Sequence, residues 1–323
     1  MQNDMKLSNY SWIKDIAKTD IRGKKILVAG GTGFIGKRLL QILSYLNAEV
    51  YAITRRSDHI KMKNIVYLKG DLRNLDGLKE MRNGNRYDAA VYMAANIPLR
   101  GEKKETLFDA KRTTLDPYLN FLEAFGEDVK QLIYISSIDA IGHCAQEGYG
   151  EEIFPDTPTP YGLAKYAGEF YTKSLAEGLS IPYAILRFSQ VYGPNEPVVR
   201  IIPILKECLL ENRQFSLITS GNEKRRYLYI DDAAQAVCRA IVNKEEMGVF
   251  NIAGPDTVTV MGLIRLMERI WNRKLDLEVK NIKEGEDNIP SIDKAETLLG
   301  YCPEISAEKG LVKVKEEENE SFG

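Results

Sequence analysis

Two residues that can exchange protons, Tyr161 and Lys165, stand four positions apart in the chain. In a helix this spacing puts both side chains on one face, and a nearby ammonium lowers the pKa of a phenol towards a useful proton-transfer range. The spacing alone is weak evidence, because the chain has 17 tyrosines and Tyr10 with Lys14 repeats the pattern. Other parts of the sequence must therefore decide whether Tyr161 is catalytic.

A pair of serines, Ser136 and Ser137, follows the apolar run Leu132–Ile135, which predicts a buried strand. Ligands of open α/β sheets lie at the carboxyl ends of the strands, where these serines stand. We expect Ser137 to hydrogen-bond a substrate carbonyl while Tyr161 donates or removes a proton. The other interpretation is a turn-forming serine and a packing tyrosine, and the glycine loop described next favours catalysis over it.

A glycine-rich loop supplies a partner for such chemistry. It comes directly after the predicted strand Lys24–Ala29 and directly before the amphipathic segment Lys37–Leu46. Glycines in this context allow a tight turn, the approach of a pyrophosphate and close helix–strand packing, while the helix N-terminus faces the anion. The sequence therefore predicts a dinucleotide site on the loop residues Gly30, Gly31, Thr32, Gly33, Phe34, Ile35 and Gly36.

The end of the second predicted strand indicates which dinucleotide binds. NAD sites usually carry Asp or Glu there, but this chain has Thr54, Arg55 and Arg56. A guanidinium suits a 2′-phosphate, so we predict that Arg55 and Arg56 bind NADP(H) in preference to NAD(H), which stays possible. Asp71 and Leu72 close the third strand. Asp71 either accepts a hydrogen bond from the adenine amino group or caps the following helix.

Alternating strands and helices must position these residues. The expected strands are 26–29, 50–54, 65–68, 89–95, 132–135 and 183–188, and the expected helices are 37–46, 107–125 and 161–176. This alternation predicts a parallel sheet covered on both faces. After residue 193, helices and short strands mix less regularly, at 200–211, 215–218, 233–243, 249–252 and 261–271. The predicted fold class is α/β, a Rossmann-type doubly wound parallel sheet with a smaller C-terminal α/β substrate lobe.

The predicted parts of the chain are an N-terminal helical extension (1–23), a NAD(P)-binding Rossmann domain (24–193) and a mainly substrate-binding lobe with a charged tail (194–323). In the extension, Ser8 is the expected N-cap of a short helix whose apolar residues are Trp12, Ile13 and Ile16. The tail from Lys313 is dominated by charge and is expected to fray.

Composition excludes several other classes of function. The net charge of the 323 residues is −2, which gives no general attraction to nucleic acid. No apolar run reaches the roughly 18 residues of a membrane span and no signal-peptide core is visible, so we expect a cytoplasmic protein without membrane contact. Four dispersed cysteines indicate reduced thiols, and the two histidines, His59 and His143, supply too few ligands for a metal site or a Ser-His-Asp triad.

Together these motifs resemble those of the extended short-chain dehydrogenase/reductases, in particular the NAD-dependent epimerase/dehydratase family acting on nucleotide sugars. The resemblance runs from Lys24 to about Glu308 and includes the glycine loop and residues 70–73, 93–95, 136–137, 161–165, 186–194, 226–232 and 250–254. It implies hydride transfer at a sugar carbon, with Tyr161 as acid/base, Lys165 on the nicotinamide ribose and Ser137 as carbonyl partner.

The same resemblance implies further contacts. It implies that Met93, Ala94 and Ala95 lie against the cofactor, and that Gln190 and Arg226 contact the substrate, Arg226 near its diphosphate. The partner it implies is a nucleotide sugar, and the assembly it implies is a homodimer formed through helices 107–125 and 161–176.

Three departures from the family pattern narrow the activity. Thr114 replaces an asparagine that many relatives carry in the helix before the fifth strand. Gln190 replaces another asparagine and is one methylene longer, so the diphosphate contacts are expected to shift. Ile138 follows Ser137 where the 4,6-dehydratases carry an acidic residue. An isoleucine cannot protonate a leaving hydroxyl, so elimination of water is not expected.

The leading hypothesis is an NADP(H)-dependent reductase of a nucleotide-linked keto-sugar, with Tyr161 as proton donor. The alternative is a nucleotide-sugar epimerase that keeps and recycles NAD(P), because the same residues serve both. A non-catalytic NADP-sensing or RNA-binding relative is disfavoured, since Tyr161, Lys165 and Ser137 are all present and the net charge is −2. Reduction of a non-sugar ketone also stays open.

Overall fold

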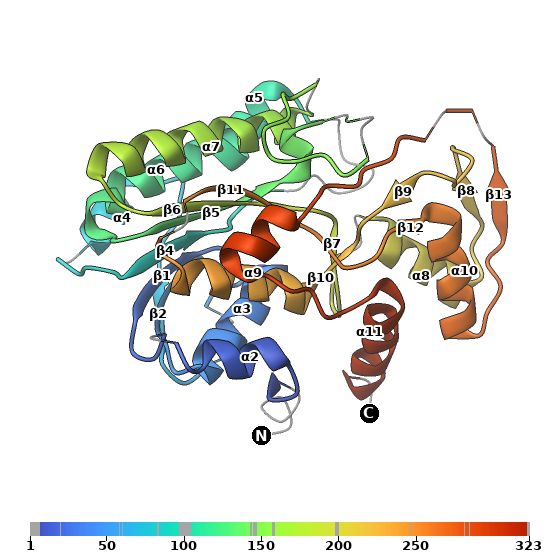
Figure 1. The fold of residues 1–323 in the computed structure, drawn as a ribbon, viewed down its shortest axis with the longest axis horizontal. Helices are drawn as coiled ribbons and strands as arrows, with labels where there is room; N and C mark the ends of the chain where they lie inside the picture. Colours follow the sequence, from blue (N-terminus) through green and yellow to red (C-terminus); the bar gives the residue numbers. More distant parts are fainter. Residues whose placement is uncertain are drawn as a thin grey trace.

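A parallel β-sheet forms the centre of the computed structural model, which describes residues 7–19, 21–57, 59, 61–82, 84–96, 105–142, 144, 147–156, 159–197, 200–245, 247–280, 282–283 and 285–321. Within these ranges seven parallel strands pair in the order β11-β6-β5-β4-β1-β2-β3 (Figure 1). The order reverses between β1 and β4, and such a switch point opens a crevice at the carboxyl ends of the strands. The predicted Rossmann-type α/β fold is confirmed.

The strands agree closely with the predicted apolar runs. Four residues of β1, all four of β4 and all six of β5 are buried, as expected for strands covered on both faces. The bounds are β1 (Lys25–Ala29), β2 (Glu49–Thr54), β3 (Ile65–Lys69), β4 (Ala89–Tyr92), β5 (Leu132–Ser137), β6 (Tyr183–Phe188) and β11 (Gly248–Ile252).

Helices cover both faces of the sheet (Figure 1). One face carries α4 (Leu75–Met81), α5 (Leu107–Ala110), α6 (Asp116–Phe125) and α7 (Pro160–Leu179), and a π-helical turn (Lys111–Leu115) joins α5 to α6. The other face carries α3 (Phe34–Tyr45) and α9 (Ile230–Val242), with α2 (Ser11–Ile16) packed against α9. Each face has its own apolar cluster against the sheet, so the sheet is a rigid platform for its carboxyl-end loops.

The N-terminal extension is bound to the rest of the fold through α2. Trp12, Ile13 and Ile16 are buried as predicted, and Tyr10 hydrogen-bonds Asp231 at the start of α9. The predicted capping role of Ser8 is wrong, because α2 begins at Ser11 and its N-cap position is Tyr10, which makes no side-chain cap bond. Residues 1–6 of the extension, like His143, lie outside the described residues.

The chain after residue 193 is shared between the sheet and a smaller lobe. It contributes β11 and α9 to the sheet layers, while α8 (Ile201–Glu211) and α10 (Val260–Trp271) belong to the lobe seen at the right of Figure 1. Short strand pairs complete this region: β8 (Phe215–Leu217) with β13 (Leu277–Val279), β9 (Lys224–Arg225) with β12 (Val258–Thr259), and β7 (Val191–Tyr192) with β10 (Leu228–Tyr229).

The charged tail is a helix rather than a frayed end. Helix α11 (Ala307–Ser321) runs through most of it, so the prediction of fraying from Lys313 is wrong. The physical reason is that apolar residues of α11 pack against the rest of the fold, which the many charges in its sequence did not indicate. Leu311 and Val314 are buried, and Lys315 Nζ donates to the Ile270 carbonyl at the end of α10.

Three further properties concern the described residues alone. No helix among them combines the length and apolar character needed to cross a bilayer. They contain no group of three or more His, Cys, Asp or Glu side chains arranged to hold a metal ion. Cys144, Cys208, Cys238 and Cys302 are free cysteines.

Candidate active site

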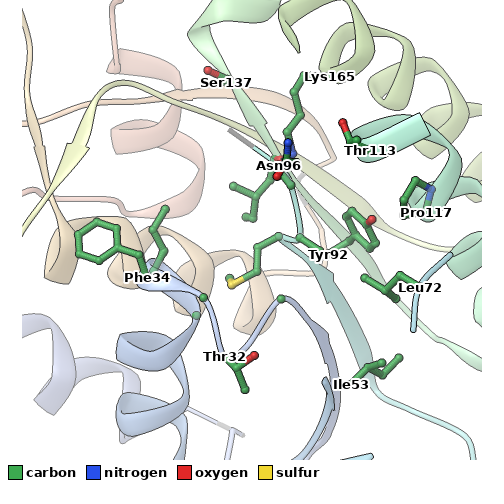
Figure 2. Close-up of a pocket in the computed structure, with 18 of the residues that line it drawn as sticks. Thr32, Phe34, Ile53, Leu72, Tyr92, Asn96, Thr113, Pro117, Ser137 and Lys165 are labelled. Atoms are coloured by element: carbon green, nitrogen blue, oxygen red, sulfur yellow. The ribbon is translucent and has the colours of Figure 1, made fainter. Parts of the chain in front are cut away.

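A cavity of about 640 Å³ opens at the carboxyl ends of the sheet strands. Figure 2 shows Thr32 and Phe34 on one side of it and Ser137 and Lys165 on another. The structure brings together sixteen of the predicted site residues in this lining: Gly30, Thr32, Gly33, Phe34, Ile35, Gly36, Arg55, Arg56, Asp71, Leu72, Met93, Ala94, Ala95, Ser137, Tyr161 and Lys165.

The glycine loop fits a dinucleotide diphosphate. Gly30 has φ +90° and a Cβ there would lie 2.6 Å from the Ala94 backbone N, so a side chain is excluded. A Cβ on Gly36 would lie closer than 3.0 Å to the Gly30 carbonyl, so α3 packs tightly on the loop. Gly33 is the N-cap of α3 and has no side chain to cap it, which leaves the first N–H groups of the helix directed at the cavity.

The end of β2 carries hydroxyls and guanidiniums in place of a carboxylate. Thr54 Oγ1 lies 3.1 Å from Thr32 Oγ1 and accepts a hydrogen bond from the Arg56 backbone N. This pair joins β2 to the glycine loop. Arg55 and Arg56 are exposed and line the cavity, so their charges lie beside whatever group enters there.

Asp71 is a cavity carboxylate and not a helix cap. Asn74 is the N-cap of α4 and accepts from the Gly77 backbone N, so the capping alternative for Asp71 is wrong. The hydrogen bonds from Arg73 lower the pKa of Asp71 to about 2. The group is therefore an anionic acceptor at neutral pH, as recognition of an amino group requires.

Local packing sets the position of Tyr161 on the first turn of α7. The helix begins at Pro160, where proline is favoured, and Gly162 N donates to the capping Thr159 Oγ1 at 3.0 Å. Gly162 packs against the Asp139 carbonyl so closely that a Cβ would collide with it. The helix start is thereby held against the turn that follows Ser137, and Tyr161 and Ser137 line one cavity.

Lys165 is bound to β5 and not to Tyr161. Its Nζ donates to the Ile135 carbonyl at 2.8 Å and lies 6.0 Å from the centre of the Tyr161 ring. Burial lowers the pKa of Lys165 to about 7, and Glu169 opposes that shift. The amine is therefore only partly charged near neutral pH.

The expectation that Lys165 lowers the pKa of Tyr161 is wrong. Burial is the largest influence and raises the pKa of the Tyr161 phenol, and Asp139 raises it further. Arg200 acts in the opposite direction. Desolvation of the phenolate outweighs nearby positive charge, so Tyr161 is a protonated acid here.

Ser137 has a structural bond that leaves it able to donate. Its Oγ accepts from the Asp139 backbone N at 3.1 Å, so the turn fixes the side chain while the hydroxyl proton is available to a carbonyl oxygen. The neighbouring Ser136 Oγ donates to Glu169 Oε1 at 2.6 Å, and Arg187 Nη2 lies 2.7 Å from Glu169 Oε2. The buried Glu169, one helical turn beyond Lys165, therefore joins α7 to the end of β5 through Ser136 and to β6 through Arg187.

Two predicted substrate residues are not part of the cavity lining. Arg226 donates from Nε to the Gly254 carbonyl at 2.9 Å and from Nη1 to the Pro290 carbonyl at 3.1 Å, so its guanidinium joins backbone segments. Gln190 contributes its carbonyl to Leu228 N. The diphosphate contacts expected of them stay predictions.

Sequence reasoning missed several lining residues. Ser189, Glu196 and Arg200 line the cavity, as do Asn96 and Thr113. The available signal for four of them was their position after strands, since Asn96 follows β4 and the other three follow β6 and β7, and loops at the carboxyl ends of parallel strands form the crevice wall. Thr113 lies in the helical turn between α5 and α6 and had no such signal. Their side chains have no fixed spacing from the catalytic residues, so the pattern alone did not single them out.

A dinucleotide loop, a tyrosine acid and a lysine around one crevice of a Rossmann-type sheet define an NAD(P)-dependent enzyme of the extended short-chain dehydrogenase/reductase type. The chain belongs to the NAD dependent epimerase/dehydratase family, whose model matches residues 26–253.

Similar proteins act on nucleotide sugars. A putative UDP-glucose 4-epimerase of Methanocaldococcus jannaschii is 30% identical over 307 residues, which cover 90% of this chain and 96% of that protein. The structure of Thermotoga maritima UDP-glucose 4-epimerase with UDP-glucose matches with TM-score 0.81 and 25% identity, covering 93% of this chain and 100% of that one. Bacillus cereus UDP-glucuronic acid 4-epimerase in complex with UDP-glucuronic acid and NAD matches with TM-score 0.80 and 25% identity, covering 91% and 99%.

Proposed function

We propose that the protein is a nucleotide-sugar 4-epimerase that retains and recycles NAD(P). The observation that carries the proposal is that Tyr161, Ser137 and the glycine loop line one cavity. The 4-epimerases among its relatives favour this activity over the keto-sugar reductase, which the same residues would also serve.

The chain's own residues supply the proton chemistry. NAD(P), when bound, supplies a hydride acceptor and later the donor. As the phenolate, Tyr161 would remove the proton of the sugar hydroxyl while the carbonyl forms, and as the phenol it would return that proton to the same oxygen. Ser137 donates a hydrogen bond to the carbonyl oxygen. Hydride and proton both return to the sugar, so neither the cofactor nor water is consumed.

No acidic side chain stands at the position from which a dehydratase would protonate the leaving hydroxyl. Ile138 is 4% exposed and its apolar side chain cannot protonate a leaving hydroxyl. A dehydratase is therefore not proposed.

The test is interconversion of isomers. Purified enzyme with a trace of NAD(P) is incubated with UDP-glucose, and the sugar is analysed by chromatography while absorbance at the reduced-nicotinamide band is followed. Appearance of the 4-epimer without net change in absorbance supports the proposal. Stoichiometric oxidation of NADPH with a 4-keto nucleotide sugar, and no interconversion, establishes the reductase instead.

The cofactor preference rests on Arg55 and Arg56, for which we propose a contact with the 2′-phosphate of NADP(H). The end of β2 carries Thr54, whose hydroxyl pairs with that of Thr32. No carboxylate stands at this position to repel the phosphate. Replacing both arginines by glutamine is expected to lower the affinity for NADP(H) relative to NAD(H) about tenfold or more, while the exposed Arg22→Gln control changes neither. Tighter binding of NAD(H) than of NADP(H) by the wild type contradicts this assignment.

We further propose a homodimer formed through α6 and α7. The exposed surface of α7 carries the large apolar side chains Phe170 (58% exposed) and Tyr171 (48% exposed), which a subunit interface would cover. Phe170→Asp is expected to convert the dimer to a monomer in sedimentation equilibrium. The control is Phe154→Asp, at a site that is 87% exposed and outside these helices. A wild type that sediments as a monomer refutes the proposal.

A further inference from the structure

An aromatic ring lies against the amine of Lys165. Its Nζ is over the ring of Tyr134 on β5, 5.0 Å from the ring centre. An ammonium within about 6 Å of a ring face is attracted by the π-system, and the attraction is strongest where water is excluded. Lys165 is 2% and Tyr134 1% exposed, so this contact is shielded from solvent.

Packing on α6 and α7 fixes the Tyr134 ring. It stacks on Tyr118 of α6, with ring centres 4.4 Å apart and an angle of 28° between the planes. The Tyr118 hydroxyl in turn lies 2.6 Å from Thr172 Oγ1 on α7. Gly168 of the same helix makes room for the ring, since a Cβ there would lie 2.3 Å from the Tyr134 hydroxyl oxygen. The ring is therefore held in place beside Lys165.

The other polar groups around Lys165 come from β5, α7 and β6. The Ile135 carbonyl accepts from Nζ at 2.8 Å, and the centre of the Tyr161 ring is 6.0 Å from it. Glu169 raises the pKa of Lys165, but its carboxylate is 2.7 Å from Arg187 Nη2, which offsets part of its charge. Because burial still lowers the pKa of Lys165 to about 7, every contact that favours the ammonium affects how much of it is charged at neutral pH.

Tyr134 itself lies outside the reacting space. It is part of the apolar cluster that contains Tyr118, and it does not line the cavity. Burial raises the pKa of its phenol well above the ordinary value, so the ring stays neutral. Any effect of Tyr134 on the reaction must therefore act through Lys165.

We propose that Tyr134 is a positioning residue for Lys165, whose amine the ring face holds at the Ile135 carbonyl and stabilises in its charged form. A charged Lys165 favours the Tyr161 phenolate that removes the proton of the sugar hydroxyl, so the ring supports proton transfer without touching the substrate. The inference rests on the proposed function, since it concerns a group of the same reaction.

The first test measures the ionisation of Lys165 directly. The NMR resonance of its ε-carbon follows protonation of the amine and is assigned by its loss in Lys165→Met. Tyr134→Leu should lower the midpoint of the Lys165 titration by about one pH unit, because a shielded contact between ring and ammonium changes the proton affinity about tenfold. Tyr134→Phe keeps the ring and should retain the wild-type midpoint. The matched control is Phe121→Leu, which removes a buried ring of the same cluster and should also leave the midpoint unchanged.

The second test separates this role from packing alone. The dissociation constant of NADH or NADPH, whichever the wild type binds more tightly, is measured by fluorescence near pH 5.5 and near pH 8. If a ribose hydroxyl accepts from the ammonium, loss of its charge weakens binding only above the pKa of Lys165. Tyr134→Leu should therefore bind the cofactor about tenfold more weakly than the wild type near pH 8, and equally well near pH 5.5. Weakening by the same factor at both pH values overturns the proposal.

An unchanged midpoint in Tyr134→Leu, or an equally lowered one in Tyr134→Phe, also overturns it. Thermal melts identify a folding defect, and Tyr134→Met then takes the place of the leucine variant with the same expected shift. Isomer interconversion by the wild type separates the two proposals. A lowered midpoint in Tyr134→Leu without interconversion by the wild type refutes the epimerase alone, whereas interconversion with an unchanged midpoint refutes the role of Tyr134 alone.

Discussion

Burial of Lys165 predicts that its contribution to the free energy of unfolding becomes more favourable as the pH rises from 7 to 9, because the cost of burying its ammonium disappears. The side chain is 2% exposed, and burial lowers its pKa from 10.5 to about 7. Between these two values the unfolded chain holds a proton that the folded chain has lost. Unfolding therefore becomes less favourable as the pH rises through this window, and below about pH 7 the gain is absent.

The size of the effect follows from the shift. One pKa unit corresponds to about 1.4 kcal/mol, so the contribution of Lys165 should grow by about 2 kcal/mol between pH 7 and pH 9. Glu196 and Asp232, with pKa values raised to about 8 and about 7, contribute with the opposite sign as they lose protons. The informative quantity is therefore the difference between the wild type and Lys165→Met, which removes the titrating group and keeps its bulk.

Urea unfolding at pH 7, 8 and 9 measures this difference. The free energy of unfolding of the wild type minus that of Lys165→Met should rise by about 2 kcal/mol over the range. Lys173→Met is the matched control, since Lys173 is on the same helix but its side chain is 57% exposed, and its difference should be flat. A flat difference for Lys165→Met refutes the reasoning and would mean that the buried amine keeps its charge.

Three further changes test the rest of the site. Tyr161→Phe should lower kcat about a hundred- to ten-thousandfold without changing cofactor affinity, and near-normal turnover would refute its role as acid/base. Gly36→Ala puts a Cβ against the Gly30 carbonyl, so cofactor affinity should fall about tenfold in a fluorescence titration, and unchanged affinity would contradict the loop assignment. Arg187→Met leaves Glu169 buried without its ion partner and should cost about 3–5 kcal/mol in urea unfolding, partly recovered when Glu169→Met is added. A wild-type midpoint in the single variant would show that the pair is unimportant.

The parts of the site that the sequence predicted depend on local spacing and on one rule of topology. Gly30, Gly33 and Gly36 are separated by fixed intervals within a single strand–turn–helix unit. Tyr161 and Ser137 could be placed together because parallel strands bring their carboxyl ends to one edge of the sheet. Both inferences need the element type and its direction, and the periodicity of the apolar residues supplies these.

The parts that could not be predicted depend on contacts between distant segments. Lys165 has the expected spacing from Tyr161, but its bond to Ile135 depends on how α7 packs on β5. Arg226 lies in a family motif, yet its guanidinium is bonded to carbonyls about 28 and 64 positions further along the chain. The charge-rich α11 has a few apolar residues, including Leu311, and their burial follows from the contact of α11 with α10. Contacts between residues that are far apart in the chain cannot be predicted from the periodicity of a short segment.

The state of Lys165 also bears on whether the cofactor is retained. At neutral pH burial keeps the Tyr161 phenol protonated and leaves Lys165 close to half-charged, so removal of a proton by Tyr161 depends on a charged Lys165 that favours the phenolate. A ribose hydroxyl that accepts from Lys165 would favour the ammonium, so cofactor binding should take up a proton near and above pH 7. In an epimerase that retains its cofactor this proton is taken up once and kept through many turnovers. A reductase would take it up and release it in every cycle, so the KM for its cofactor would rise with pH above about 7 whereas epimerase turnover would show no such dependence.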